Sequence, residues 1–114
     1  MCAAKHRLSN LVAMIDYNKI QSAGPTAEIL ELEPLLDKWR AFGCSATEVD
    51  GHDVDALRKL LQAKPFAHAR PFAIICHTVK GRGVSFAEHN PIWHHQSRIG
   101  AEGIKELHDA LDTA

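Results

Sequence analysis

Cysteine is scarce in this sequence, and the three cysteines are far apart. Cys2, Cys44 and Cys76 form no Cys-x-x-Cys pair. This arrangement argues against a disulfide framework and against a cysteine-rich zinc site, and it suits reduced thiols in the cytosol.

An excess of charge of one sign and a long apolar run are also missing. The 13 basic and 14 acidic residues leave a formal net charge of −1, which gives no electrostatic argument for nucleic acid or an anionic membrane as a partner. No apolar run approaches the roughly 20 residues of a transmembrane helix. The first ten residues, MCAAKHRLSN, lack the apolar core of a signal peptide. We therefore expect a cytoplasmic protein that binds neither nucleic acid nor membrane.

The sequence does contain an apolar run that is followed directly by a polar segment. Leu11 to Ile15 is long enough for a strand buried on both faces, and a polar loop that includes Asn18 follows it and closes at Gly24-Pro25. Open α/β sheets bind their ligands at the carboxyl ends of such strands. The side-chain carbonyl of Asn18 is a neutral oxygen of the kind that a hard cation accepts.

Three short apolar runs, separated by helical patterns, predict the fold. We expect strands at Leu11–Tyr17, Ser45–Val49 and Phe72–His77. Strands that alternate with helices indicate parallel pairing through right-handed crossovers. The predicted class is therefore α/β, with a parallel sheet and flanking helices, in one domain at most.

Helix signals occupy the intervals between these strands. Glu33-Pro34 marks a helix start and Gly43 suits the position just after the helix end. Asp53 can cap the next helix, whose apolar stripe is Val54, Leu57, Leu60 and Leu61.

The remaining segments are less regular. Thr26 is expected to cap a short turn, and Lys80 to Arg98 reads as a long irregular segment. Gly100 to Leu111 predicts a final amphipathic helix, with its inner face at Ile104, Leu107 and Leu111.

The polar loop resembles part of a known cofactor motif. Asp16 to Thr26 (DYNKIQSAGPT) is similar to the second half of the thiamine-diphosphate motif of the transketolase family. The resemblance continues, in family order, through WRAFG, EVDGHD, HTVKGRG and Trp93-His94. There is no glycine before Gly24, so the Gly-Asp-Gly of the first half is absent. We therefore expect residues 1–114 to be a partial diphosphate-binding domain that lacks its N-terminal half.

The resemblance implies roles for four residues. Asn18 would bind Mg²⁺ through its side-chain oxygen and Ile20 through its backbone carbonyl. Lys80 would contact thiamine diphosphate, and His94 would lie at the diphosphate and take part in catalysis. The residue after His94 is His95, where the family usually has glycine.

Other interpretations of these residues remain open from the sequence. Asn18 is also a common turn residue that bonds its own backbone, and Lys80 also suits a solvated surface. His89, His94 and His95 could suggest a metal cluster, but their spacing is not that of a zinc site. The turn with His52 and Asp53 resembles a catalytic pair, yet a helix cap at Asp53 accounts for it.

The resemblance implies the N-terminal subunit, or a piece, of a transketolase. Such enzymes move a two-carbon ketol unit between sugar phosphates with thiamine diphosphate and Mg²⁺. The expected partner is a second copy or a C-terminal subunit that holds the cofactor's pyrimidine. Two alternatives are a related enzyme for a different sugar and a non-catalytic fragment that only associates with partner chains.

Overall fold

A computed structural model describes residues 1–63, 69–95 and 98–113. The chain divides into two compact units, and each is described by itself. The first consists of Met1–Tyr17 and Glu31–Thr78, and the second of Asn18–Leu30 and Val79–Ala114.

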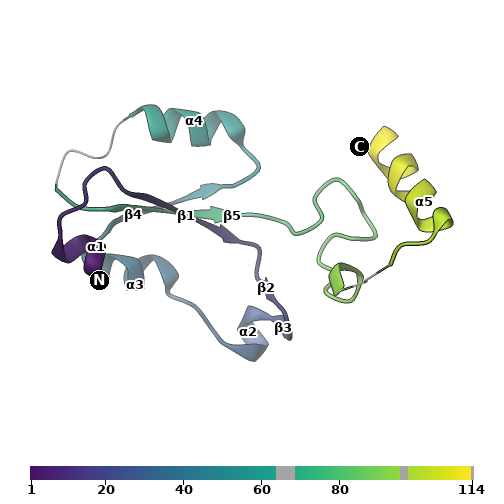
Figure 1. The fold of residues 1–114 in the computed structure, drawn as a ribbon, viewed down its shortest axis with the longest axis horizontal. Helices are drawn as coiled ribbons and strands as arrows, with labels where there is room; N and C mark the ends of the chain where they lie inside the picture. The colour runs from purple at the N-terminus through teal and green to yellow at the C-terminus, as the bar shows by residue number, and fades with distance from the viewer. Residues whose placement is uncertain (64–68, 96–97, 114) are drawn as a thin grey trace. The chain divides into compact units, whose positions relative to one another are not determined.

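The first unit is built on a three-stranded parallel sheet (Figure 1). Its strands are β1 (Val12–Tyr17), β4 (Ser45–Asp50) and β5 (Phe72–His77), in the order β1-β5-β4. The register pairs Val12 and Ser45 with Phe72. Five successive residues of β5 are buried, as expected for a central strand covered on both faces. The predicted parallel sheet with flanking helices is therefore confirmed.

Helices cover both faces of this sheet. Figure 1 shows α4 (Val54–Gln62) on one face, and α1 (Cys2–Lys5) and α3 (Leu35–Ala41) on the other. The core beneath α4 is formed by Phe72, Ile74 and Cys76, against which Leu57 and Leu60 pack. These apolar contacts hold the sheet and α4 together.

The ends of α3 and α4 follow their sequence signals. Gly43 adopts a φ of +87°, and the backbone N–H groups of Gly43 and Cys44 donate to Arg40 and Trp39, which is the Schellman termination. The Asp53 carboxylate accepts a hydrogen bond of 2.8 Å from the backbone N–H of Ala56. The predicted cap at Asp53 is therefore confirmed.

The second unit is made of short elements. It contains the hairpin of β2 (Ile20–Gln21) and β3 (Gly24–Pro25), then α2 (Thr26–Ile29), the 3₁₀ helix η1 (Trp93–His95) and α5 (Ala101–Asp112). Two expectations need correction. Thr26 is the first residue of α2 rather than its cap, and the segment 80–98, of which 96 and 97 lie outside the described residues, contains η1.

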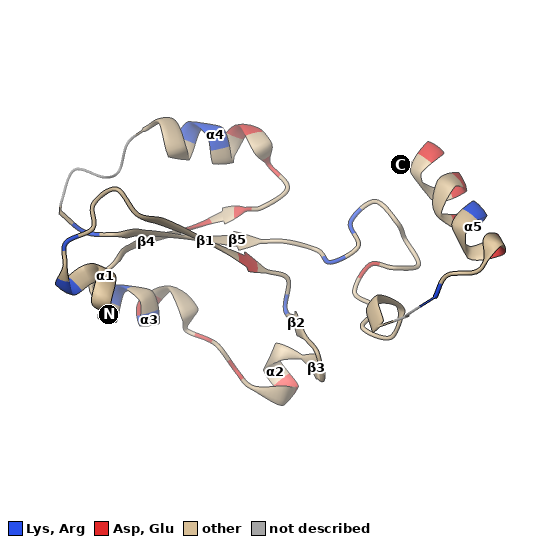
Figure 2. Ribbon diagram, viewed as in Figure 1, with Lys and Arg blue, Asp and Glu red and all other residues tan. Residues whose placement is uncertain are grey.

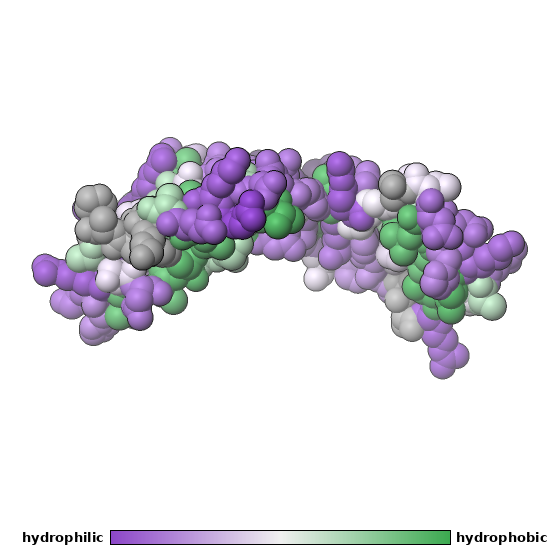
Figure 3. Space-filling model, turned by 90° about the horizontal axis from the view of Figure 1, so that it is seen from above, coloured by the Kyte–Doolittle hydropathy of each residue, from purple (hydrophilic) through white to green (hydrophobic). Residues whose placement is uncertain are grey.

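Several apolar side chains predicted to be internal are at the surface, where Figure 3 shows hydrophobic residues among hydrophilic ones. Val54 is 73% exposed, and Ile104 and Leu111 on α5 are 48% and 59% exposed. Periodicity identifies an apolar stripe but does not show which of its members meets a neighbouring element. No helix in the described parts of the chain is long and apolar enough to span a bilayer.

Candidate functional site

The loop after β1 is shaped by the side chain of Asn18. Its carboxamide oxygen accepts a hydrogen bond of 3.0 Å from the backbone N–H of Ile20, and Lys19 between them adopts a φ of +66°. This is the local Asx turn that asparagine favours. The backbone carbonyl of Lys19 then accepts the N–H of Thr26 at 2.9 Å. The turn and this bond fix where the β2–β3 hairpin begins.

The loop after β5 closes on itself around Ala87, which is fully buried. Gly81 adopts a φ of +82°, and a Cβ on it would lie only 2.8 Å from the Ala87 carbonyl oxygen. Glycine meets both requirements, since it tolerates positive φ and has no Cβ. The backbone N–H of His89 donates to the Lys80 carbonyl at 3.3 Å. Lys80 is therefore held at the base of a compact loop.

His94 is oriented by the same loop. Its Nε2 lies 3.0 Å from the Ala87 carbonyl oxygen, and its ring meets Trp93 edge-on, with ring centroids 5.1 Å apart. The Asn90 side-chain oxygen accepts the N–H of Trp93 at 3.1 Å, which starts η1. A carbonyl oxygen only accepts hydrogen bonds, so Nε2 carries the proton and Nδ1 is the nitrogen left for a ligand.

A pocket of about 260 Å³ joins these loops within the second unit. Three of the four predicted site residues, Ile20, Lys80 and His94, line it. Asn18 is not among the described lining residues, and its oxygen bonds to Ile20 instead. The other lining residues are Gln21, Ser22, Pro91 and His95.

The chemistry of this lining suits an anion. The described part of the lining contains an ammonium and two imidazoles, with no carboxylate. Lys80 makes no ion pair or side-chain hydrogen bond with any residue that the structure describes. Figure 2 shows this basic loop directly after β5. An unpaired ammonium beside nitrogen donors fits the oxygens of a diphosphate.

Magnesium fits the chain's own donors only in part. Asn18 and Ile20 supply two neutral carbonyl oxygens, and one lone pair of the Asn18 oxygen is already used by the N–H of Ile20. Mg²⁺ takes six oxygens, so phosphate and water would have to complete its coordination. Within the described residues, no group of three or more His, Cys, Asp or Glu side chains could hold a metal ion.

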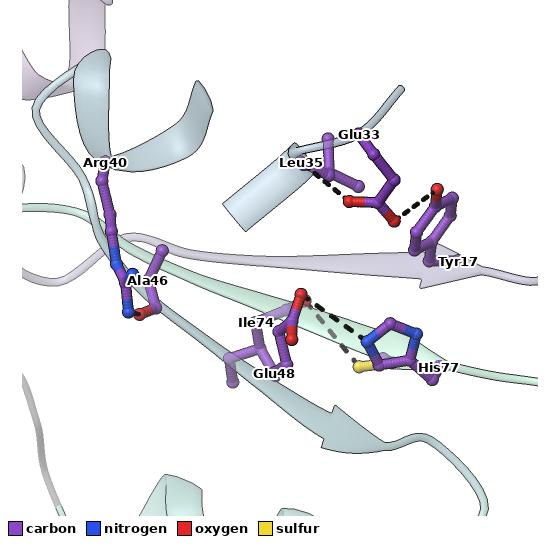
Figure 4. Close-up of polar contacts among 9 residues, drawn as sticks. Tyr17, Glu33, Leu35, Arg40, Ala46, Glu48, Ile74 and His77 are labelled. Carbon is purple, nitrogen blue, oxygen red and sulfur yellow. Dashed lines mark hydrogen bonds and ion pairs between the residues drawn. The ribbon is translucent and has the colours of Figure 1, made fainter. Parts of the chain in front are cut away.

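Sequence reasoning missed the polar network at the carboxyl end of the sheet in the first unit (Figure 4). Tyr17 donates from its hydroxyl to the Glu33 carboxylate at 2.9 Å, and Glu33 also accepts the N–H of Leu35 at 2.9 Å. His77 Nε2 lies 3.7 Å from a Glu48 carboxylate oxygen. Register pairing of the strands brings Tyr17 and His77 together, and no local motif could have indicated this.

A buried thiol lies near the same end of the sheet. Burial, and then the nearby charge of Asp16, raise the pKa of the Cys76 thiol above its ordinary value. Asp16 itself accepts a hydrogen bond from the Thr78 hydroxyl. The raised pKa keeps Cys76 protonated at neutral pH, which makes it a poor nucleophile.

Comparison with known proteins shows that the chain is similar to transketolases. A family model described as "Transketolase, thiamine diphosphate binding domain" matches residues 1–113. The chain is 37% identical over 115 residues to one of the subunits of the apulose-4-phosphate transketolase of Phocaeicola vulgatus, covering 98% of the chain and 41% of that protein.

Other relatives share the likeness. A 6-deoxy-6-sulfo-D-fructose transketolase subunit of a Clostridium species is 46% identical over 88 residues, which are 77% of the chain and 32% of that protein. Human transketolase is 36% identical over 116 residues, covering 97% of the chain and 18% of that protein.

Solved transketolases have the same fold. The Campylobacter jejuni enzyme superimposes with a TM-score of 0.81 at 24% identity, over 97% of the chain and 17% of that protein. The Pichia stipitis enzyme, solved with sedoheptulose 7-phosphate, gives 0.81 at 25% identity, over 97% of the chain and 16% of that protein. The chain thus spans less than half the length of each of these relatives.

Proposed function

The chain belongs to the transketolase family, and from that premise we propose that it supplies the diphosphate-facing part of a thiamine-diphosphate- and Mg²⁺-dependent ketol transferase. The reaction is the transfer of a two-carbon ketol group from a ketose phosphate to an aldose phosphate. Thiamine diphosphate, when bound, supplies the electron sink for this transfer. The chain's own residues bind and orient the phosphate groups.

The observation that supports this proposal most strongly is the ammonium of Lys80 in the pocket, which has no partner among the residues that the structure describes. A lysine ammonium acts on a phosphate as a point charge, and the lining residues that the structure describes offer no carboxylate to neutralise it. Gly81, directly after Lys80, lets the loop pack closely against Ala87. Lys80 therefore suits a contact with the diphosphate oxygens.

His94 would act beside Lys80 at the same anion. Its Nε2 is committed to the Ala87 carbonyl, so Nδ1 is the atom that meets a ligand. When neutral, Nδ1 accepts a hydrogen bond from a sugar hydroxyl; when protonated, it donates to a phosphate oxygen. The bond to Ala87 holds the ring in one orientation, which is what a positioning role in catalysis requires.

Asn18 and Ile20 would hold the magnesium ion jointly with the phosphates. The Asx turn leaves one lone pair on the Asn18 oxygen, and Ile20 can contribute only its backbone carbonyl. Both oxygens are neutral, so most of the ion's charge remains available to the diphosphate. Mg²⁺ and cofactor are therefore expected to bind together.

A partner chain is part of the proposal. Two relatives that the chain resembles over most of its length are themselves named as subunits. We infer that this chain works in a complex with a C-terminal transketolase subunit, which holds the pyrimidine of the cofactor, or as a homo-oligomer. We expect the complex to work in the cytoplasm, in sugar-phosphate metabolism.

A related ketol transferase for a different sugar is the second candidate. The names of those two relatives specify apulose 4-phosphate and 6-deoxy-6-sulfo-D-fructose, and the chain is at least as similar in sequence to these proteins as to human transketolase. The pocket residues are proposed to bind phosphate groups rather than to distinguish one sugar from another. Both candidates therefore share the same cofactor site.

The test is the apparent affinity of the assembled enzyme for thiamine diphosphate, measured in a ketol-transfer assay. Lys80→Gln removes the ammonium and should weaken this affinity by about ten- to a hundredfold, as for the loss of a charged hydrogen bond. Lys105→Gln, on the exposed face of α5, is the matched control and should leave the affinity unchanged. Equal behaviour of the two variants would contradict the proposal.

A further inference from the structure

His95 has no role in the arrangement described so far, yet it lines the pocket with Lys80 and His94. It also lines an adjoining hollow of about 500 Å³ together with Ser22, Pro91 and Ile92. The imidazole of His95 therefore lies where a polar hollow and a mainly apolar one meet. A ligand that reached from one hollow to the other would pass this side chain.

The two neighbouring histidines of the pocket differ in how their rings are held. The His94 ring is fixed by its bond to Ala87 and by Trp93. The His95 ring makes no hydrogen bond, ion pair or ring contact with any residue that the structure describes. Only its backbone is anchored, through the N–H that donates to Ile92 at 3.2 Å. Both ring nitrogens of His95 are therefore available to a ligand.

The charges around His95 indicate that such a ligand would be an anion. Among the described residues, Lys80, on the loop after β5, and His94, on η1, are the ionisable groups that share the pocket with it, while β2 and the adjoining Ser22 contribute Ile20, Gln21 and a hydroxyl. A protonated imidazole beside Lys80 would attract the same anions as the ammonium does. An anion that binds Lys80 thus favours proton uptake by His95.

We propose that His95 is a phosphate-binding residue of this pocket, donating to phosphate oxygens already held by Lys80 and making the affinity for phosphate rise as the pH falls. The inference rests on the proposed function of the pocket and adds a residue to it. Protonation places N–H donors on both ring nitrogens, and a charge-assisted hydrogen bond to a phosphate is about twice as strong as a neutral one. The phosphate can belong to the cofactor or to the sugar.

The test is a titration of the chain with inorganic pyrophosphate, followed by NMR of the histidine ring protons and lysine signals, at pH values of about 5.5 and 8, on either side of the histidine range. Below that range the wild-type chain should bind about five- to tenfold more tightly than His95→Gln. Above it, the two should bind alike. Comparing chains at the same pH cancels the protonation of pyrophosphate itself.

Two further variants separate binding from structure. His95→Arg carries a charge that is not lost with pH, so it should keep the tight binding at both values. His108→Gln, an exposed histidine of α5, should behave like the wild type throughout. A purely structural role for His95 would not give this pattern of rescue by arginine.

The source of the phosphate is found by adding ribose 5-phosphate to the chain already saturated with pyrophosphate. A shift of the His95 ring signals on this second addition assigns His95 to the sugar phosphate; a shift on pyrophosphate alone assigns it to the cofactor. If Lys80→Gln abolishes binding, His95→Gln binds pyrophosphate like the wild type at both pH values, and ribose 5-phosphate leaves the His95 ring signals unchanged, the inference about His95 is wrong and the proposed function stands. If pyrophosphate at about 10 mM, a concentration that detects even millimolar affinity, moves neither histidine nor lysine signals, both are wrong.

Discussion

At Gly81 the chain combines positive φ with close packing, and both depend on the missing Cβ. We predict that Gly81→Ala destabilises the second unit by at least the roughly 1–2 kcal/mol that a left-handed conformation costs an L-residue, with an added clash against Ala87. Since the Ala87 carbonyl orients His94, pyrophosphate binding should weaken as well. The measurements are urea unfolding and the pyrophosphate titration.

Gly83 offers a matched control for this prediction. Its φ is +91°, but a Cβ there would have no neighbour within 4 Å. Gly83→Ala should therefore show the conformational cost alone and leave the orientation of His94 intact. Equal losses in the two variants would mean that close packing at Ala87 is unimportant.

Cys76 gives a prediction about pH. The thiol pKa is raised in the folded chain by burial and by Asp16, so the unfolded chain loses this proton at a lower pH. Above about pH 8.5 the unfolded state binds fewer protons, and the free energy of unfolding falls as the pH rises. Cys76→Ala should reduce this fall between about pH 8 and 10. An identical pH dependence in both chains, measured by urea unfolding, would contradict the assignment.

At the scale of elements, the apolar stripe of α4 contains residues that we expect to contribute differently to stability. Leu57 packs on the core of Phe72, Ile74 and Cys76, whereas Val54 is 73% exposed. We predict that Leu57→Ala lowers the free energy of unfolding by about 2–3 kcal/mol, toward the low end for leucine because the site is only partly buried. Val54→Ala should change it by no more than about 0.5 kcal/mol. A comparable loss in both would show that α4 packs differently.

The sequence was sufficient to predict elements whose signals are local. Five consecutive apolar residues identified β5, and Asp53 and Gly43 marked helix ends because caps act within one turn. Val54 belongs to the same apolar stripe of α4 as Leu57, yet it is exposed. Periodicity identifies the stripe but does not show how far the sheet extends beneath the helix. The hairpin of β2 and β3 is too short for any alternating pattern to appear.

The candidate site was predictable only where family motifs or unusual residues marked it. Lys80 was recognisable within the KGRG segment. Asn18 had two interpretations, a turn residue and a metal ligand. The structure contains the Asx turn, and the metal role stays a proposal. Gln21 and Ser22 line the pocket but look like ordinary loop residues. The bond from His94 to Ala87 spans seven residues of irregular chain, a distance at which no periodic signal exists.

For the whole molecule, we predict that this chain by itself binds thiamine diphosphate weakly and has no ketol-transfer activity. The Mg²⁺ donors proposed for it, on Asn18 and Ile20, are neutral oxygens, and this ion gives up water reluctantly. The pocket is also small against the 300–1,000 Å³ of typical ligand sites, at about 260 Å³, so we expect another chain to bind the rest of the cofactor. Calorimetry with Mg²⁺ and thiamine diphosphate should show no micromolar binding. Tight binding or any turnover by the isolated chain would overturn this prediction.

The proposed role in two-carbon transfer is tested most directly by ketol transfer in the enzyme assembled from this chain and its C-terminal partner, with Mg²⁺ and thiamine diphosphate added. The wild-type assembly should transfer a two-carbon unit from a ketose phosphate to an aldose phosphate. Asn18→Ala removes a proposed Mg²⁺ ligand and should reduce the rate by at least about a hundredfold, in line with the loss of one preorganised contact at a charged site. A wild-type assembly without transfer, or an Asn18→Ala assembly as active as the wild type, would contradict the account.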